Sequence, residues 1–540
     1  MSTCPIIIAL DWDAFYCSVE EHFNPELKKI AFAVQQKQII CTCNYVARAQ
    51  GVKKLQLLVD AVKQFPDLVI VNGEDLSRYR DASKELWYFV REMVWGGKVE
   101  RLGFDELFLD VTDMVDFNMT LLDNAHVARE FTRHSPHSVL SFFFRTSQQD
   151  PSMGFSCQLP SVAGNLATGS LPEDFTGDNL RLVLGSHLCH YIRSQILEIK
   201  GYTSSGGVSI NKTLAKTAGA THKPNQQTVL FPEFAQDFLD RFDIGKIPWI
   251  GHKSKSIILD AIYKGTDGVN HDSDRTRDAT VFNVRHVASK QLFTSSLGQS
   301  SGEKLWDLLH GVDSTTVQPT PDIPTQISIE DSFRSLTSII EVQTVLRKLS
   351  NSLLDRMYID LMDSNGDWLG HPQTARLSTR PRSTGYYGSR ISRSDSLPSI
   401  VFSSSHSRDY IVDYLVDRCW MPLFSKLIGD TKTFDLVLLN VAVVNIDKAP
   451  AKTSDITSFF GKKHLVDNHV KDARREELVT KSGKGVGEHA DLEPGLELPW
   501  QEDEDLIYEE TSYRESCVVC GQRIMSFALE AHMRFHELVD

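Results

Sequence analysis

Residues 99–110 read VERLGFDELFLD, and residues 5–13 read PIIIALDWD. The first stretch predicts two short strands that meet at Asp105 and Glu106, and the second predicts a buried strand that ends at Asp11. A bare carboxylate is costly among apolar side chains, so acids embedded in such strands need a compensating partner. These two stretches therefore predict a carboxylate cluster at the ends of neighbouring strands.

Such a cluster requires cations. Two unit charges about 4 Å apart repel by roughly 4 kcal/mol at an effective dielectric near 20. An oxygen-only site suits magnesium, which keeps water and shares substrate phosphates. Two such ions can stabilise both the attacking and the leaving oxygen of an in-line phosphoryl displacement. From spacing alone, the alternative is that these residues are ordinary acids at strand ends and turns.

A second group of candidate residues carries groups that bind phosphate. Tyr45 and Arg48 lie three residues apart, hence on one helical face, where a phenol and a planar guanidinium can bind a triphosphate. Lys223 precedes Pro224, which favours an extended backbone that directs the ammonium group at phosphate. The start of an ordinary amphipathic helix and a turn lysine are the respective alternatives.

Length and composition limit the class of protein. The 540 residues exceed a single core and indicate about three or four domains. Hydrophobic residues make up 41% and charged residues 24%, which is typical of a soluble globular protein. No run of about 20 uncharged apolar residues predicts a membrane span, and the N-terminus lacks the basic region of a signal peptide. The nine cysteines show no framework spacing, which favours a reducing compartment.

The net charge of −14 is distributed unevenly. Residues 448–540 carry 12 Lys and Arg against 19 Asp and Glu, a net of −7, and residues 486–510 hold ten acids with no Lys or Arg. Half of the negative charge therefore lies in a C-terminal tail, whose polar composition predicts a disordered linker. Contacts with a polyanion would come from basic patches on the rest of the chain.

Periodicity predicts mixed helices and strands before that tail. A segment rich in Ser, Gly, Gln and Pro, at about 134–178, is expected to be an inserted mobile loop. Helices with short Gly-marked turns are expected throughout 236–315. Further helices are expected at 59–65, 83–93, 181–199, 338–355 and 409–427.

Taken in order, these pieces match one known pattern. The sequence resembles the Y-family, or translesion, DNA polymerases over about residues 5–446. The matching stretches are IIIALDWDAFYCSVEE, CTCNYVARAQGVKKL, GEDLSRYRDAS, VERLGFDELFLDVTDMV, GGVSINKTLAK and HKPNQQTVL. One branch of the family is matched more closely, through FNPELK, AVQQK, VNGEDLSRYR, VERLGFDE, KPNQQTVL and QISIEDSF.

The resemblance implies an α+β multidomain fold shaped as a right hand, with a disordered tail and a C-terminal zinc finger. It implies a palm at 1–23 and 99–235 (with the insertion at about 134–178), fingers at 24–98, a thumb at 236–315, a little finger at 326–447, a tail at 448–515 and a zinc finger at 516–540. It also implies a monomeric nuclear enzyme that carries out low-fidelity, DNA-directed synthesis on primer–template DNA from deoxynucleoside triphosphates at damaged templates.

Residue by residue, the resemblance implies that Asp11, Asp105 and Glu106 are the catalytic ligands of two Mg²⁺ ions, with Mn²⁺ as a substitute. The backbone carbonyl of Trp12 would be a further ligand. Asp13 lies in the same motif but is not expected to bind metal directly.

Nucleotide-binding positions follow from the same resemblance. Tyr16 falls at the steric-gate position, where an aromatic ring leaves no room for a ribose 2′-hydroxyl. The triphosphate would be bound by Tyr45, Arg48 and Lys223. In the matching branch, the residues at Gln36, Lys37 and Ile39 crowd the roof over the templating base, which implies unusual base pairing and unequal fidelity. A solvated loop is the alternative for Gln36 and Lys37.

Two segments are candidates for DNA contact. Residues 247–251 (IPWIG) resemble a helix-hairpin-helix turn, which offers backbone N–H groups such as that of Gly251 to DNA phosphates, although Trp249 stands where the family usually has glycine. A plain interhelical turn is the alternative. The even spacing of Arg376, Arg380 and Arg382 places them on one face of a strand, which suits sequence-independent phosphate binding, whereas Arg390 and Arg393 are expected in a solvated loop.

The tail carries two partner motifs. Ile456, Phe459 and Phe460 have the spacing of a short helical plug for sliding clamps, with Thr453 in place of the usual glutamine. The zinc-ligand spacing is that of Cys517, Cys520, His532 and His536. This segment resembles ubiquitin-binding fingers, with Arg534 where those usually carry aspartate, so ubiquitin or a ubiquitinated clamp is the expected partner.

A rival hypothesis from another class is a non-catalytic, polymerase-like scaffold that recruits repair factors to stalled forks. The presence of all three carboxylates argues against it.

Overall fold

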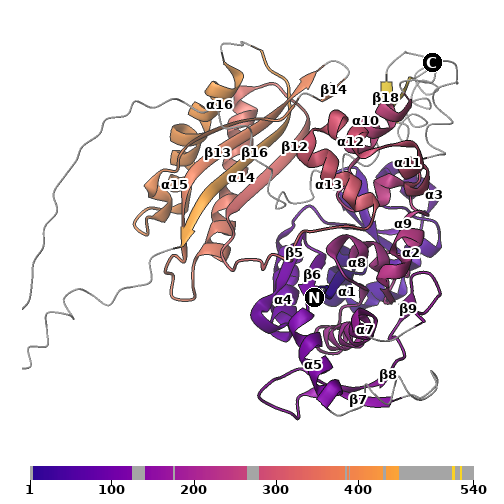
Figure 1. Ribbon diagram of the computed structural model, residues 1–540. Helices are drawn as coiled ribbons and strands as arrows, with labels where there is room; N and C mark the ends of the chain where they lie inside the picture. Colours follow the sequence, from indigo (N-terminus) through magenta and orange to yellow (C-terminus); the bar gives the residue numbers. More distant parts are fainter. Residues whose placement is uncertain are drawn as a thin grey trace, which may run out of the picture. The chain divides into compact units, whose positions relative to one another are not determined.

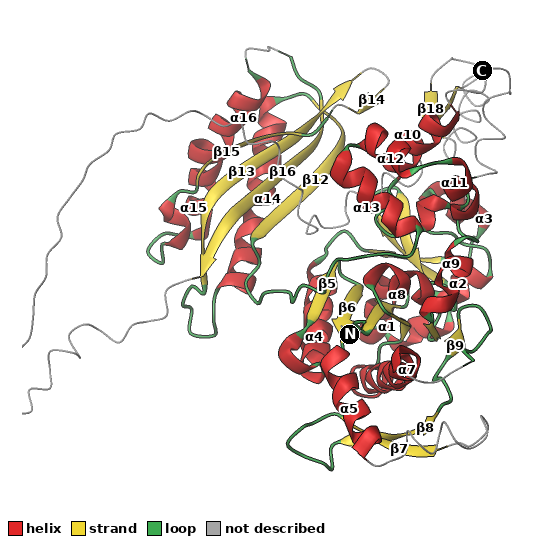
Figure 2. Cartoon of the chain, viewed as in Figure 1, coloured by secondary structure: helices red, strands yellow, loops and turns green. Residues whose placement is uncertain are grey.

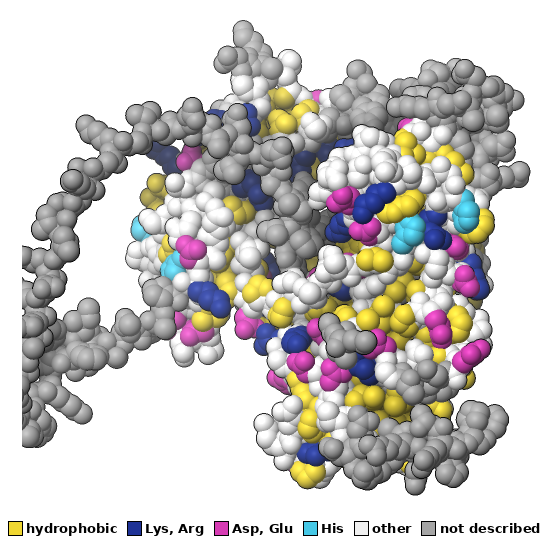
Figure 3. All heavy atoms as spheres, viewed as in Figure 1, with side chains coloured by type: hydrophobic (Ala, Val, Ile, Leu, Met, Phe, Trp, Pro, Cys, Tyr) yellow, Lys and Arg dark blue, Asp and Glu magenta, His cyan; other side chains and the backbone are white. Residues whose placement is uncertain are grey.

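The computed structural model describes residues 4–124, 140–173, 177–263, 279–383, 386–387, 389–429, 433–448, 514–516 and 523–525. The chain divides into two compact units, with the boundary between Thr320 and Pro321, and both mix helices with sheet (Figures 1 and 2). No helix in these ranges is long and apolar enough to cross a membrane. On the face of unit 1 that Figure 3 shows, acidic and basic side chains are interspersed.

Unit 1 is built on a six-stranded sheet of order β5-β6-β1-β10-β11-β9. The central strand β1 (Ile7–Trp12) pairs antiparallel with both β6 (Glu106–Asp110) and β10 (Ser204–Ser209). The remaining strands are β5 (Val99–Leu102), β11 (Gln227–Val229) and β9 (Asn165–Leu166). The apolar run at the N-terminus is therefore a buried central strand, as its composition predicts.

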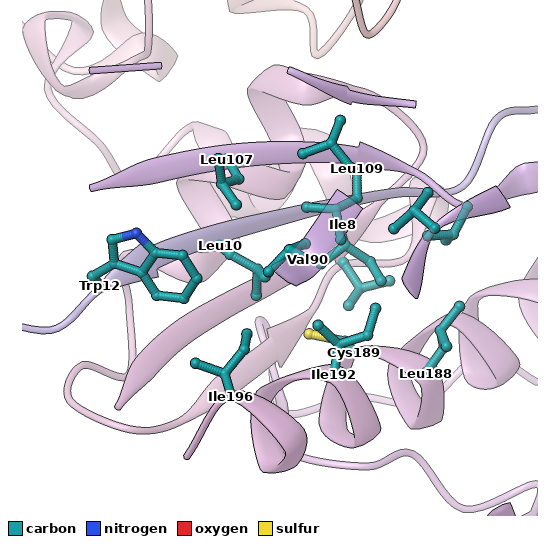
Figure 4. Packing of buried hydrophobic residues seen from close by; sticks show 14 of the residues in the cluster. Ile8, Leu10, Trp12, Val90, Leu107, Leu109, Leu188, Cys189, Ile192 and Ile196 are labelled. Atoms are coloured by element: carbon teal, nitrogen blue, oxygen red, sulfur yellow. The ribbon is translucent and has the colours of Figure 1, made fainter. Parts of the chain in front are cut away.

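Helices cover both faces of this sheet. Helix α7 (Gly177–Gln195) packs on one face, where Figure 4 shows Ile8, Leu10 and Trp12 of β1 together with Leu188, Cys189 and Ile192 of α7. Helix α8 (Lys212–Gly219) packs on the other, where Ala215 joins Ile7, Ala9 and Phe108 in a separate cluster. Side chains alternate along a strand, so Asp11 follows Ala9 onto the α8 face.

A smaller sheet of order β3-β2-β4 lies between β1 and β5 in the sequence. Its strands are β2 (Phe32–Gln36), β3 (Ile39–Cys43) and β4 (Val69–Asn72), and it packs with α2 (Tyr45–Ala49) and α3 (Leu58–Gln64) around Ala33, Ile40, Cys43, Ala47, Val52, Ala61 and Leu68. Helix α4 (Ser77–Met93) begins at Ser77, earlier than its apolar spacing predicts. It packs against α1 (Phe15–Phe23).

The loop predicted at 134–178 is wrong for much of that segment. Strand β7 (Leu140–Arg145) pairs antiparallel with β8 (Gly154–Leu159), and β9 joins the main sheet. Phe144, Cys157 and Leu159 are buried. Within residues 140–173, the polar residues that suggested a loop belong to turns and to outward positions of the strands, and they conceal the alternation of the inward ones.

The predicted helices of 236–315 are confirmed outside residues 264–278. They are α9 (Ala235–Leu239), α10 (His252–Tyr263), α11 (Val281–Val287), α12 (Lys290–Leu297) and α13 (Gln299–Leu309). They pack around a buried cluster that includes Phe238, Ile250, Phe293 and Leu308 and that also contains Leu214 and Ala218 of α8.

Unit 2 is a sheet of order β12-β16-β13-β14, with β15 also paired to β13. Its strands are β12 (Gln326–Leu336), β13 (Gly370–Ser383), β14 (Tyr386–Tyr387), β15 (Ile391–Ser396) and β16 (Leu436–Lys448). Its core also contains buried residues of α14 (Ile339–Leu361), α15 (Arg408–Leu415) and α16 (Met421–Ile428). Arg393 lies in β15 and not in the loop expected for it, because this edge strand is polar and lacks an apolar alternation.

Candidate active site

Strand register brings the predicted acids to one edge of the main sheet. Asp11 in β1 lies directly opposite Glu106 in β6 and Ser205 in β10. Asp105 lies in the turn between β5 and β6, and its carbonyl accepts a 2.8 Å hydrogen bond from the backbone N–H of Trp12. The hydroxyl of Ser83 in α4 donates to the carbonyl of Phe104 and holds the same turn.

Two lysines neutralise part of this negative charge. Lys223 Nζ lies 2.5 Å from Asp11 Oδ2, and Lys216 Nζ lies 2.5 Å from Glu106 Oε2. Lys223 was predicted to bind phosphate, whereas Lys216 was not predicted at all. A signal for Lys216 exists in the sequence. It follows Lys212 by four residues, so α8 presents both ammonium groups toward the sheet that carries the acids.

Three carboxyl groups share only two lysine partners. Burial, opposed by Lys223 and reinforced by the charge of Glu106, raises the pKa of Asp11 to about 6. Burial, followed by the charges of Asp11 and Glu106, raises the pKa of Asp105 to about 8. Three acids facing two lysines therefore favour the uptake of a further cation or of protons.

The donor chemistry fits magnesium, because the charged donors are carboxylate oxygens with uncompensated charge. The ammonium groups of Lys216 and Lys223 stand in for cations on two of the three acids. Within the residues that the structure describes, no group of three or more Asp, Glu, His or Cys side chains is arranged to hold a metal ion.

Asp13 is buried and belongs to a hydrogen-bond network behind the site. It accepts bonds from the Ser205 hydroxyl at 2.7 Å and from the backbone N–H of Asn225 at 2.8 Å. Arg193 in α7 donates to the Asn225 side chain at 2.9 Å and to Gln227 at 3.1 Å. This network fixes the turn that carries Lys223, and sequence reasoning missed Arg193 because its partners are distant in the chain.

Tyr45 and Arg48 lie on α2 as the spacing predicts. The Arg48 guanidinium carbon is 4.6 Å from the centre of the Tyr45 ring, and its Nε donates to the Cys43 carbonyl at 3.0 Å. Asn44 caps the helix by accepting from the N–H of Ala47. Burial, followed by the charge of Asp13, raises the pKa of Tyr45 to about 12, so Tyr45 lies within electrostatic reach of the acidic motif.

Gln36, Lys37 and Ile39 form the turn between β2 and β3, in which Gln36 pairs with Ile39. Lys37 has a φ of 52°, and its N–H donates to Glu74 at 3.2 Å. The Gln36 amide donates to the carbonyl of Gly73 at 3.1 Å. Hydrogen bonds therefore anchor the turn.

Trp249 adopts a conformation that favours glycine, with a φ of 72°. Its Nε1–H donates to Thr213 Oγ1 of α8 at 3.2 Å, and its ring centre lies 5.9 Å from Lys216 Nζ. Gly251 is exposed, and a Cβ at its position would contact nothing within 4 Å. The turn therefore keeps the backbone shape of a glycine-containing turn, and the side chain of Trp249 packs on α8.

In unit 2, β13 carries all three predicted arginines. Ala375, Leu377 and Thr379 are buried, so Arg376 and Arg380 lie on the opposite face of the strand. Arg376 donates to Gln326 at 2.7 Å, and the exposed Arg382 lies 3.6 Å from Asp435. Arg390 forms an ion pair with Glu330 at 2.7 Å. The clamp residues and the zinc ligands predicted in the tail lie outside the described residues.

Comparison with known proteins adds independent findings. Residues 10–220 match the model of the impB/mucB/samB family. The chain is 32% identical to DNA polymerase iota of Homo sapiens over 442 residues, which are 82% of this chain and 52% of that relative. It is 30% identical to DNA polymerase iota of Drosophila melanogaster, over 85% of this chain and 56% of the relative. It is 24% identical to DNA polymerase eta of Drosophila melanogaster, over 67% of this chain and 41% of that relative.

The chain thus spans about half the length of the iota relatives that it matches. The family match covers the strands and helices that carry Asp11, Asp105, Glu106 and Lys216. The branch of the family that the sequence resembles more closely is that of DNA polymerase iota, and these relatives agree with it. Residues 10–220 of this chain are therefore an impB/mucB/samB domain, the domain of the Y-family.

Proposed function

We propose that this chain is a DNA-directed DNA polymerase that carries out low-fidelity translesion synthesis. The observation that supports this most strongly is the excess of three acidic groups, Asp11, Asp105 and Glu106, over two lysines, with the pKa values of Asp11 and Asp105 raised, within a Y-family domain. Such an imbalance suits a site that binds cations together with a polyanionic substrate.

In the proposed reaction the 3′-hydroxyl of a primer attacks the α-phosphate of a deoxynucleoside triphosphate. A bond forms between the 3′-oxygen and the α-phosphorus, the hydroxyl proton passes to solvent, and the bond to pyrophosphate breaks, so that pyrophosphate leaves. Two magnesium ions held by Asp11, Asp105, Glu106 and the Trp12 carbonyl would neutralise the attacking and leaving oxygens. Tyr45, Arg48 and Lys223 bind the triphosphate, and Lys223 exchanges Asp11 for phosphate when the nucleotide arrives.

The other predicted parts are proposed in supporting roles. Residues 24–98 and 236–315 serve as fingers and thumb, and residues 326–447 as a little finger that binds DNA phosphates through Arg376, Arg380 and Arg382. The turn at Gln36, Lys37 and Ile39 lies over the templating base. Its anchoring to Gly73 and Glu74 supports a fixed roof of the kind that gives unequal fidelity.

For the tail we propose a clamp-binding plug at residues 456–460 and a ubiquitin-binding zinc finger at residues 516–540, in a nuclear protein. Strands β17 (Arg514–Ser516) and β18 (Arg523–Met525) pair with Ser516 opposite Arg523. Cys517 and Cys520 lie between them in the sequence, which is the order of a two-cysteine knuckle. If Cys517→Ala with His536→Ala leaves zinc content and ubiquitin pull-down unchanged, the finger proposal is wrong.

Primer extension with magnesium tests the enzyme proposal directly. We expect incorporation by the full chain and its loss in the double variant Asp105→Ala with Glu106→Ala. Asp113→Ala, which removes an exposed partner of Lys98, is the matched control and retains activity. A folded chain that binds primer–template but incorporates nothing would favour the rival scaffold. Extension opposite each of the four template bases tests the roof, because equal fidelity on all four contradicts the iota-like assignment.

A further inference from the structure

Two tyrosines stack where α1 and α4 meet. The ring centres of Tyr16 and Tyr79 lie 4.2 Å apart with an interplanar angle of 16°, so one ring covers the other. The ring of Phe104, beside Asp105, lies 6.3 Å from Tyr16 at 41°. Tyr16 is half-buried, whereas Tyr79 is fully buried. Tyr79 therefore backs Tyr16 from the protein interior.

Tyr79 is itself held in place by an ion pair whose carboxylate is buried and whose guanidinium is exposed. Its hydroxyl donates to Glu20 Oε1 at 2.5 Å, and Arg78 Nη1 lies 2.8 Å from Glu20 Oε2. Glu20 is 4% exposed, so its charge depends on these two partners. Burial and the neighbouring Glu20 raise the pKa of Tyr79, which keeps the phenol protonated as a donor. The ring of Tyr79 is thus held on its face by stacking against Tyr16 and at its hydroxyl by the hydrogen bond to Glu20.

Tyr79 packs closely against Gly73, next to strand β2 of the smaller sheet. A Cβ at Gly73 would lie 2.3 Å from Val34 Cγ1 and 3.2 Å from the Tyr79 hydroxyl oxygen. The carbonyl of the same glycine accepts the hydrogen bond of Gln36. A bulkier residue at 73 would push on Tyr79, and Tyr79 has no room to retreat in that direction.

We infer that Glu20, Arg78 and Tyr79 are positioning residues that fix the ring of Tyr16 and thereby set how strictly ribonucleotides are excluded. This inference rests on the proposed function. A ring that blocks a 2′-hydroxyl does so only while it cannot recoil, because a contact relieved by a small shift excludes nothing. The stacked and hydrogen-bonded Tyr79 removes the room for that shift.

The test compares kcat/KM for each deoxynucleotide with that for its ribonucleotide in single-nucleotide primer extension. Tyr79→Ala removes the backing ring, and we expect the deoxy-to-ribo ratio to fall about tenfold or more, equivalent to about 1.4 kcal/mol. Tyr79→Phe keeps the stack and loses only the hydroxyl, so the ratio should fall less. Glu20→Gln should behave like Tyr79→Phe. Deoxynucleotide incorporation should stay within a few-fold of the wild-type value in each variant.

A double-variant cycle distinguishes positioning from general loosening of the core. Once Tyr16→Ala has removed the blocking ring, adding Tyr79→Ala should lower the ratio no further, because Tyr79 acts through Tyr16. An additive loss, or an unchanged ratio in Tyr79→Ala, overturns the inference. If Tyr79→Ala does not fold, Tyr79→Leu and Tyr79→Phe provide the same comparison. Absence of deoxynucleotide incorporation by the wild-type chain would instead refute the proposed function itself.

Discussion

Helix α8 forms two lysine–glutamate pairs one turn apart, and they differ in kind. Lys212 pairs with Glu100 of β5 at 3.1 Å, and the side chains of both residues are almost fully buried, at 7% and 5% exposure. Lys216 pairs with Glu106 of β6 at 2.5 Å, and their side chains are 30% and 20% exposed. Glu100 also accepts the N–H of Gln318 at 2.8 Å, so its charge is fully compensated.

The second pair is crowded by Asp11 and Asp105, whose pKa values are raised. Burial of charge alone therefore does not mark the candidate site, because the Lys212–Glu100 pair is the more deeply buried one. What distinguishes the candidate site is that its acidic groups outnumber the lysines that face them. We expect loss of the balanced pair to reduce stability, and loss of the unbalanced pair to reduce activity.

The largest expected effect comes from breaking the unbalanced pair. Glu106→Gln removes a charge that the proposed reaction needs, and we expect kcat to fall by about a hundredfold to a thousandfold or more. The melting temperature should not fall, since one of three repelling carboxylates is gone. Primer extension and thermal denaturation of the same sample test both parts. Activity of Glu106→Gln within threefold of the wild type would contradict the expectation that the Lys216–Glu106 pair serves activity.

Breaking the balanced pair should have the opposite result. Lys212→Met leaves Glu100 buried without its partner, which typically costs about 3–5 kcal/mol of unfolding free energy. Urea denaturation measures this cost, and the double variant Lys212→Met with Glu100→Gln should recover part of it. The folded protein should polymerise within a few-fold of the wild-type rate. A stable but inactive Lys212→Met variant would place this pair in the active site instead.

A smaller effect is expected from Asp105→Asn. The pKa of Asp105 is about 8 in the fold against an ordinary 3.8, so the folded state binds the proton more tightly than the unfolded state does. The free energy of unfolding therefore falls as pH rises from about 4 to about 8. Asparagine does not titrate, so the variant should gain about 1 kcal/mol or more over the wild type at pH 8 without metal. Urea denaturation at pH 5 and pH 8 in a chelator measures this, and magnesium should reduce the difference.

The smallest effect is expected from an exposed pair between Lys98, which precedes β5, and Asp113, in the first turn of α5 (Thr112–Asn124). Lys98 Nζ lies 2.8 Å from Asp113, with side chains 37% and 60% exposed. Asp113→Asn should change the free energy of unfolding by less than about 1 kcal/mol and leave activity unchanged. If Asp113→Asn lowers the free energy of unfolding as much as Lys212→Met does, the contribution of these ion pairs to stability depends more on their geometry than on their burial.

The sequence predicts the parts of this site that depend on local pattern. The apolar run before Asp11, the strand pair around Asp105 and the helix start at Tyr45 all have a period or a cap that is visible in a short window. Lys216 and Arg193 were missed because their roles depend on strand register and helix packing, which join residues far apart in the chain. The hairpin of β7 and β8 was missed because its polar outward positions mask the inward Phe144 and Cys157.

Trp249, whose backbone is left-handed, places a fluorescent indole ring beside Lys216. An indole 5.9 Å from the Lys216 ammonium group senses the position of that charge. If binding of magnesium or nucleotide draws Lys216 away from Glu106, we expect the field at the ring to change and its emission to shift. The difference in fluorescence between the wild type and Trp249→Phe separates this signal from those of the other tryptophans. Ligand binding at the carboxylates then becomes visible without any attached dye.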